Sequence, residues 1–264
     1  MPTHTGIATL SLFGALLLLP GCSEPGQTEI ARGNVLASRR KFDQALESYR
    51  SAVRAAPGRA HPRELLGHLL FDLGRTAEAR LAYQEAIQAD PGTALEARIG
   101  LARADAEEGK HDQALERLDS VLNQQPNNLY ALLSRASIAL RRNRPGDAQA
   151  AIADTAKAML VDSKNASVLY LRGSSFVAAG ELDQAAASFR RLEDTHPSLP
   201  LAWYGYARLA SAQGDRSAAL SNLAKAREKA LKLPGGWNGG EVLADPNLRS
   251  LRNDPEFTAL IRTQ

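Results

Sequence analysis

Three histidines near one another in the chain are the side chains best suited to metal chemistry in this 264-residue sequence. His61 and His68 are seven residues apart, a spacing that places two side chains on one face of a helix. Together with His111 they would offer imidazole nitrogens to a transition metal. The sequence sets no acidic ligand at a fixed spacing beside them, and it contains no paired-cysteine motif, nucleophile elbow or Walker loop. We therefore expect surface or groove histidines, with no metal, no cofactor and no catalytic residue.

The single cysteine, Cys22, follows the one long apolar run of the sequence. Residues 7–19 carry no charge and are about 13 residues long, short of the ~20 that span a bilayer. The run, the small residue before Cys22 and the polar stretch after it resemble a bacterial lipoprotein signal. That resemblance implies a signal peptide over 1–21, lipid attachment at Cys22 and a tether over 22–27. In that family the residue after the cysteine influences sorting, and Ser23 implies an outer-membrane anchor facing the periplasm; a simple signal peptide with an incidental cysteine is the alternative.

The composition predicts a helical globular chain. Hydrophobic residues make up 44% and charged residues 23%, while aromatic residues are only 5%. Alanine and leucine are common and runs of β-branched residues are scarce, which favours helix over strand. The net charge of +3 is small, and basic and acidic residues are interspersed. We therefore expect no nucleic-acid partner.

A periodic pattern of small residues extends over most of the chain. One set of alanines recurs at intervals of 34, 35, 34, 37 and 34 residues. These are Ala45, Ala79, Ala114, Ala148, Ala185 and Ala219. Twelve residues before them stand Gly33, Gly67, Ala102, Ala136, Gly173 and Ala207, and four residues after them stand Tyr49, Tyr83, Leu118, Ile152, Phe189 and Leu223. Paired small residues let two helices approach closely, and a large residue one turn later fills the space beside them.

The period, the small and large positions, and the proline that ends several copies resemble the tetratricopeptide repeat (TPR). The resemblance implies an all-α fold, a right-handed α-solenoid of about six helix–turn–helix repeats over 28–233, with a C-terminal capping segment. Asp43, Thr76, Asp112, Asp183 and Asp215 precede the second helices and are expected to cap them. The fourth copy has a basic loop at 141–147, and its longer interval predicts a longer second helix, from Ala148 to about Val161.

The C-terminal residues 234–264 are predicted to form a glycine-rich break followed by short capping helices. Asp245-Pro246 and Asp254-Pro255 each combine an N-cap residue with a proline suited to the first helical position. Apolar residues follow in both helices, so the segment is expected to cover the last repeat. A flexible docking arm is the alternative.

The resemblance also implies where a partner binds, because positions 2, 5, 9 and 12 of the first helices line the groove in this family. The candidate groove residues are Tyr130, Leu133, Tyr170, Ser174, Tyr204, Arg208, Arg103 and His68. Ile30 stands with Asn34 where the family's carboxylate clamp has a lysine with an asparagine, so binding of acidic chaperone C-termini is not implied. Tyrosines suit a peptide or protein segment. The alternative is that they pack between neighbouring helices.

These observations predict a non-catalytic periplasmic lipoprotein that acts as a protein-interaction scaffold in a cell-envelope assembly or secretion system. The step from repeat fold to cellular role is an analogy, because a fold specifies a surface and not a function. A glycan-binding or exopolysaccharide-export component, with tyrosines as stacking platforms, is the alternative. The sequence contains no motif that would support an enzyme.

Overall fold

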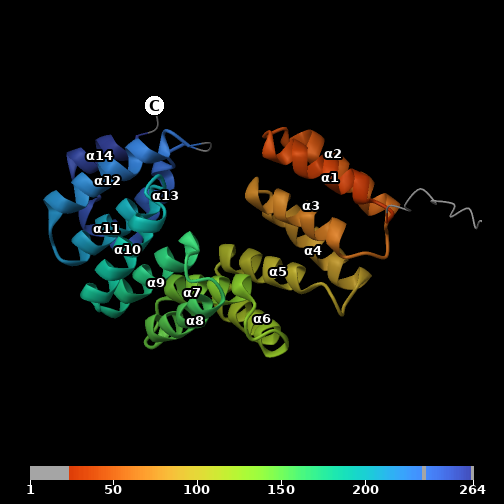
Figure 1. Cartoon of the computed structure of the whole chain (residues 1–264), viewed down its shortest axis with the longest axis horizontal. Helices are drawn as coiled ribbons and strands as arrows, with labels where there is room; N and C mark the ends of the chain where they lie inside the picture. Colours follow the sequence, from red (N-terminus) through yellow and green to blue (C-terminus); the bar gives the residue numbers. More distant parts are fainter. Residues whose placement is uncertain (1–23, 234–235, 263–264) are drawn as a thin grey trace, which may run out of the picture. The chain divides into compact units, whose positions relative to one another are not determined.

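The computed structural model of the chain describes residues 24–233 and 236–262, and every regular element within them is a helix (Figure 1). The elements are α1 (Gln27–Ser38), α2 (Phe42–Ala55), α3 (His61–Asp72), α4 (Thr76–Ala89), α5 (Leu95–Glu107), α6 (His111–Gln124), α7 (Leu129–Arg142), α8 (Asp147–Val161), α9 (Ala166–Ala179), α10 (Leu182–Thr195), α11 (Leu201–Ala212), α12 (Arg216–Ala230), α13 (Gly239–Ala244), the 3-10 helix η1 (Pro246–Leu251) and α14 (Pro255–Ile261). The predicted all-α repeat architecture is confirmed. The helix α1 includes Gln27, which the sequence analysis assigned to the tether.

The chain divides into two compact units, Met1–Pro57 and Gly58–Gln264. In the first unit, α1 and α2 form one helical hairpin with Ala45, Leu46 and Ala52 buried between them. The Tyr49 ring lies against Gly33, where an added Cβ would come within 2.4 Å of the ring. The Tyr49 hydroxyl donates a 2.7 Å hydrogen bond to Asn34 Oδ1. The predicted pairing of a small residue in the first helix with a large residue in the second is therefore present in this repeat.

In the second unit, helices α3 to α12 form five further hairpins in chain order (Figure 1). Each odd-numbered helix from α3 to α9 contacts both its own even-numbered partner and the next odd-numbered helix. Each even-numbered helix from α4 to α10 contacts the odd-numbered helix that follows it. The odd-numbered helices therefore form one continuous row in the second unit, which is the arrangement that a shared repeat core requires.

Glycines on the odd-numbered helices seat two large aromatic rings. Tyr83 on α4 is fully buried, and a Cβ added at Gly67 or Gly100 would come within 2.5 or 2.3 Å of its ring. In the same way, a Cβ added at Gly173 or Gly205 would come within 2.3 or 2.4 Å of the Phe189 ring on α10. Each ring thus fills a niche made by its own repeat and the next one. These positions require glycine because of the close approach and not because of backbone conformation.

The fourth repeat differs from the sequence prediction in register. Ala148 is half-buried, whereas Ala151 is fully buried and Thr155 takes the place of the large residue one turn later. The helix α8 has 15 residues, against 14 in α2, α4, α6 and α10, so the predicted extension of the helix is only one residue. The turn before α8, residues 143–146, is one residue longer than the turns before α2, α4, α6 and α12, and its Gly146 adopts a left-handed conformation. The assignment of Ala148 and Ile152 as the core pair of this repeat was therefore wrong.

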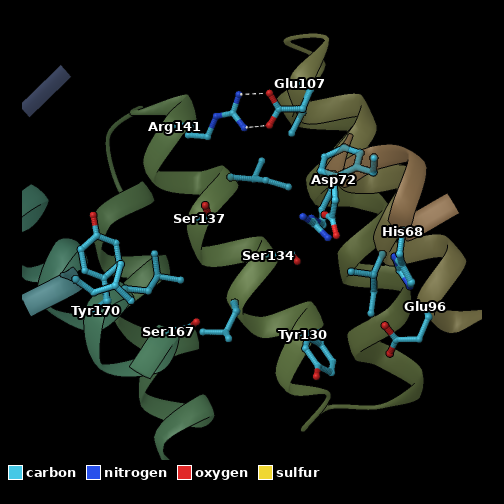
Figure 2. A pocket seen from close by; sticks show the side chains of 18 residues that line it. His68, Asp72, Glu96, Glu107, Tyr130, Ser134, Ser137, Arg141, Ser167 and Tyr170 are labelled. Carbon is cyan, nitrogen blue, oxygen red and sulfur yellow. Dashed lines mark hydrogen bonds and ion pairs between the residues drawn. The ribbon is translucent and has the colours of Figure 1, made fainter. Parts of the chain in front are cut away.

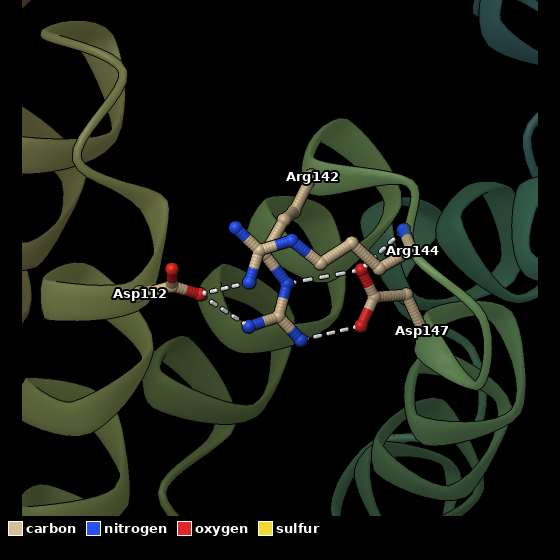
Figure 3. Close-up of polar contacts among 4 residues, drawn as sticks. All are labelled: Asp112, Arg142, Arg144 and Asp147. Atoms are coloured by element: carbon tan, nitrogen blue, oxygen red, sulfur yellow. Dashed lines mark hydrogen bonds and ion pairs between the residues drawn. The ribbon is translucent and has the colours of Figure 1, made fainter.

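Arginines and aspartates bridge α6, α7 and α8 around this turn (Figure 3). Arg142 at the end of α7 donates to both carboxylate oxygens of Asp147, at 3.0 and 2.5 Å, and to Asp112 at 2.7 Å. Arg144 also donates to Asp112, at 2.9 Å. The Arg142 guanidinium lowers the pKa of the Asp147 carboxyl, which is buried. The basic loop therefore holds three helices together through charge-assisted hydrogen bonds.

Four of the five predicted helix caps are wrong. Asp43, Asp112 and Asp183 are the second residues of their helices, and Thr76 is the first residue of its helix. In all four helices the N-cap position is the residue just before the helix, and its side chain makes no capping hydrogen bond. Only Asp215 caps its helix, by accepting a hydrogen bond from the Ala218 N–H. The acidic residues in first turns still interact favourably with the helix dipole.

The C-terminal segment packs on the last repeat as predicted. Asp245 caps η1 and Asp254 caps α14, each followed by its proline. Leu248, Leu251 and Phe257 are buried in one cluster with residues of α11 and α12, such as Leu220 and Leu223. The Trp237 ring packs on the same cluster and its Nε1–H donates to the Leu260 carbonyl at 2.9 Å. The segment therefore covers the apolar end of the repeat array.

Candidate functional site

A cavity of about 780 Å³ opens along the row of odd-numbered helices in the second unit. All of its lining residues lie on α3, α5, α7, α9 and α11, and Figure 2 shows their side chains. We call it the odd-helix pocket. Its lining residues are His68, Phe71, Asp72, Glu96, Ile99, Arg103, Ala106, Glu107, Tyr130, Leu133, Ser134, Ser137, Ile138, Arg141, Ser167, Tyr170, Leu171 and Leu201.

The lining combines an apolar floor with free hydroxyl groups. Ile99 and Ile138 are buried beneath it. Among the described residues, the hydroxyls of Ser134, Ser137 and Ser167 make no hydrogen bond with another part of the chain, whereas Ser175 and Ser188 bond the preceding helical turn. Apolar area with a few unsatisfied polar groups is typical of a binding cleft.

One end of the pocket is closed by an ion pair between neighbouring helices. Arg141 on α7 donates to both carboxylate oxygens of Glu107 on α5, at 2.5 and 3.4 Å. Figure 2 shows this pair at the end of the pocket opposite Tyr130 and Glu96. Arg103 lies between the two ends, with its guanidinium 4.5 Å from the centre of the Phe71 ring. Arg141 is therefore neutralised within the chain, and Arg103 is held by an aromatic ring.

His68 is part of the wall of the pocket. Its Nδ1 is hydrogen bonded to the Tyr83 hydroxyl at 2.9 Å, and the two rings meet edge to face. Burial, together with the charges of Arg103 and His61, lowers the pKa of His68 to about 4. The imidazole is therefore neutral at neutral pH. Asn34 and Tyr49 make the same contact in the first repeat, so this is a recurring element of repeat packing.

Glu64 is a buried carboxylate with a structural role. Its Oε1 accepts a hydrogen bond from the Ala97 N–H at 3.2 Å, and so caps the next odd-numbered helix, α5. Burial raises the pKa of this carboxyl. The residues at the same repeat position in α5 and α7, Ile99 and Leu133, line the pocket. The Glu64 carboxylate instead lies between two repeats, where it accepts a hydrogen bond from an otherwise unpaired N–H in the first turn of α5.

Two of the predicted groove residues, Tyr204 and Arg208, interact with the chain's own C-terminal segment. The Tyr204 hydroxyl donates to Asp245 Oδ2 at 2.6 Å. Arg208 lies 3.4 Å from the same oxygen and donates to the Tyr170 hydroxyl at 3.1 Å and to Ser174 Oγ at 2.8 Å. Burial, with the nearby Asp245 carboxylate, raises the pKa of Tyr204. The alternative interpretation, in which the tyrosines pack between helices, holds for Tyr204.

The structure thus brings five of the eight predicted groove residues together in the odd-helix pocket: His68, Arg103, Tyr130, Leu133 and Tyr170. Ser174, Tyr204 and Arg208 form the network with Asp245. Sequence reasoning missed Glu96, Ser167 and Leu201, although they hold the same helical position as Tyr130 in their own repeats. Applying that register to every repeat would have found them.

Other sequence-based expectations concern the metal, the membrane and the anchor. No group of three metal-ligating side chains that could hold an ion is present within residues 24–233 and 236–262. None of the helices described in the structure is long and apolar enough to cross a membrane. The predicted lipid attachment residue, Cys22, lies outside the described residues.

The row of hairpins and the pocket along one face of it define an α-helical repeat protein. Family models described as tetratricopeptide repeat match residues 70–136 in one case, and residues 30–94 and 170–231 in the other. Together the matches cover more than half of the chain, so the chain belongs to the tetratricopeptide repeat family. Proteins of this family are generally non-catalytic and bind peptides or proteins in a groove.

One curated relative is the Protein CTR9 homolog of Arabidopsis thaliana, which is 29% identical over 118 residues. The alignment covers 44% of this chain but only 11% of that protein. The similarity therefore concerns a few repeats within a much longer chain.

Solved structures share the fold over greater lengths. TTC0263, a thermophilic TPR protein of Thermus thermophilus, has a TM-score of 0.59 and 26% identity, covering 66% of this chain and 92% of its own. PilW, a widely conserved type IV pilus biogenesis factor, has a TM-score of 0.66 and 13% identity, covering 90% of this chain and 98% of its own. PilF of Pseudomonas aeruginosa has a TM-score of 0.60 and 15% identity, covering 89% and 95%. The low identities to PilW and PilF make these likenesses of fold.

Proposed function

We propose that this protein is a lipid-anchored scaffold of the cell envelope that binds an extended segment of a partner protein in the odd-helix pocket. The observation that carries the proposal is the pocket itself, which runs across five consecutive odd-numbered helices. Its volume of about 780 Å³ is comparable to ligand-binding clefts, which hold ~300–1,000 Å³. A site spread over several repeats suits an elongated occupant better than a compact one.

The chemistry of the lining favours a protein segment over a glycan. Hydroxyls of Ser134, Ser137 and Ser167 can each donate and accept hydrogen bonds, as the N–H and C=O groups of an extended backbone require. A glycan-binding platform needs exposed aromatic faces. Tyr170 and Tyr204 instead stack on each other with ring centres 6.3 Å apart, which leaves Tyr130 as the exposed tyrosine of the predicted set.

The cellular setting is proposed from the sequence. The apolar run before Cys22 resembles a lipoprotein signal, which supports a lipid anchor at the outer membrane facing the periplasm. PilW and PilF have the same fold, and PilW is a pilus biogenesis factor. We propose a comparable setting, an envelope assembly or secretion system, for this chain.

A photo-crosslinking amino acid placed at Ser134 in the full chain tests the binding site. It is expected to form a covalent adduct with one segment of one envelope protein, mapped by mass spectrometry. The matched control is the same amino acid at Lys157, an exposed residue of the even-numbered helix α8. Equal adducts from both positions, or none from position 134, would contradict binding in the pocket.

The anchor is tested separately with Cys22→Ser. The full chain is expected to fractionate with membranes and to incorporate labelled fatty acid, and the variant is expected to lose both properties. A variant that still carries the label would place the anchor elsewhere. This outcome is independent of the crosslinking result.

A further inference from the structure

Glu96 on α5 and Tyr130 on α7 occupy the same position in adjacent repeats. Each stands three residues before a pocket residue of equivalent register, Ile99 and Leu133 respectively. Both residues line the odd-helix pocket, and α5 and α7 contact each other, so the two positions lie along one edge of the pocket. Figure 2 shows them at the same end of the pocket.

Glu96 is a partly desolvated carboxylate without a cation. Its side chain is half-buried, and burial raises its pKa although the nearby Asn128 side chain opposes that shift. Among the residues that the structure describes, no Lys or Arg lies within ion-pair distance of this carboxylate. A charge in this position gains more from an added cation than an exposed one does, because the local dielectric is lower than that of water.

The other charges of the pocket leave this negative charge uncompensated. Arg141 is paired with Glu107 at the opposite end, and His68 is neutral at neutral pH. The charged side chains that remain in the lining are one cation, Arg103, and two carboxylates, Asp72 and Glu96. The pocket therefore carries one more negative than positive charge, and its complement is a basic group.

Tyr130 provides the second half of a cation site. It is 66% exposed, and among the residues that the structure describes it is the one aromatic side chain in the exposed large apolar set. The face of an aromatic ring attracts a cation, and it also covers the apolar stem of a lysine or arginine side chain. Such exposure of a tyrosine at a pocket edge is consistent with a face that a partner covers.

We propose that the odd-helix pocket selects a protein segment bearing a lysine or arginine, whose cationic head lies on the Tyr130 ring and pairs with the Glu96 carboxylate. The inference rests on the proposed function, because it takes the occupant of the pocket to be a protein segment. It adds the chemistry that decides which segments bind: a basic side chain at one fixed position, followed by residues that reach the floor near Leu133.

The first experiment is a selection from a random twelve-residue peptide display library on the immobilised full chain. Peptides selected on the wild type are expected to share a lysine or arginine at one position. Selection on Glu96→Gln or Tyr130→Ala is expected to lose that preference. The matched control is Glu116→Gln, which removes an exposed carboxylate of α6 outside the pocket and should keep the preference.

A variant that fills the pocket, Ser134→Trp, separates this inference from the proposed function. Circular dichroism first confirms that each variant keeps its helical content. If the selection yields no binders, or if the selected peptides bind Ser134→Trp as well as the wild type, the proposed function itself is overturned. Pocket-dependent binders without a basic preference, or with one that survives in Glu96→Gln, would overturn the cation site alone.

The second experiment measures affinity with one selected peptide. Replacing its basic residue by norleucine, which keeps the aliphatic stem, is expected to weaken binding to the wild type about tenfold. The same replacement should change binding to Glu96→Gln by less than about twofold, as a double-mutant cycle requires for a direct pair. Equal losses on both proteins would contradict the pairing.

Discussion

The Tyr204 hydroxyl donates a 2.6 Å hydrogen bond to the carboxylate of Asp245, which lies 41 residues further along the chain. The same Asp245 oxygen lies 3.4 Å from the deeply buried Arg208. The other Asp245 oxygen accepts the N–H of Asn247 and so caps η1. One carboxylate therefore fixes the C-terminal segment and occupies polar groups that would otherwise face the row of odd-numbered helices.

Asp245→Ala is expected to release this segment from the last repeat. The change leaves the buried Arg208 guanidinium without its carboxylate, and breaking a buried ion pair costs roughly 3–5 kcal/mol. Limited trypsin digestion, with cleavage at Arg249 and Arg252, should be much faster in the variant. Glu241→Ala, an exposed change in α13, is the control and should digest as the wild type does. Unchanged digestion of Asp245→Ala would show that apolar packing alone holds the segment.

Gly205→Ala should destabilise the protein although alanine is the better helix former. The added Cβ would come within 2.4 Å of the Phe189 ring, which is fully buried and cannot move aside freely. Overpacking of this kind costs about 1–3 kcal/mol, which exceeds the ~1 kcal/mol gain in helix propensity. Urea unfolding measures the difference. Gly58→Ala, where no atom lies within 4 Å of the new methyl group, should change stability little.

Two alanine substitutions in α8 test the register of the fourth repeat. Ala151→Leu places a large side chain at a fully buried position and should cost roughly 1–3 kcal/mol in the free energy of unfolding. Ala148→Leu, at a half-buried position, should change stability by only about 0.5 kcal/mol. Thermal or urea unfolding midpoints measure both losses, and Ala151→Leu is expected to show the larger one. The opposite ranking would restore the register that the sequence pattern suggested.

His68→Asn should reduce the sensitivity of the protein to acid. Because the pKa of His68 is lowered to about 4 in the folded state, the unfolded chain binds a proton near its ordinary pKa of ~6.5 while the folded chain does not. The stability that this histidine contributes is complete above pH ~6.5 and is lost as pH falls towards 4, by at most about 3 kcal/mol.

Asparagine is the suitable replacement, because Asn34 already makes the equivalent hydrogen bond to Tyr49 in the first repeat, at 2.7 Å. Urea unfolding at pH 7 should give similar stabilities for the two proteins. Between pH 7 and 4.5 the wild type should lose about 2–3 kcal/mol more than the variant. Parallel pH profiles would mean that His68 takes up a proton in the folded state.

The helix caps show where local sequence reasoning failed. An aspartate near the start of a helix can cap it or stand in its first turn, and these choices differ by only one or two residues. Asp43, Asp112 and Asp183 stand in the first turns of their helices and do not cap them. Asp112 instead pairs with Arg142 and Arg144, which belong to the next repeat. Partners 30 and 32 residues away cannot be read from the local pattern.

The sequence by itself determined the number and order of the repeats and the core pair of five of them, because small and large residues at a fixed spacing specify which helix faces meet. In the fourth repeat the core pair is Ala151 and Thr155, which the spacing did not predict. The sequence also placed Tyr130, Tyr170 and Tyr204 on one row of helices. Only the tertiary structure decided which of them a partner can reach. Tyr130 remains exposed at the edge of the pocket, whereas Asp245 binds Tyr204. The physical reason is that spacing fixes the direction of a side chain, but its availability depends on whether a distant segment satisfies its polar group first.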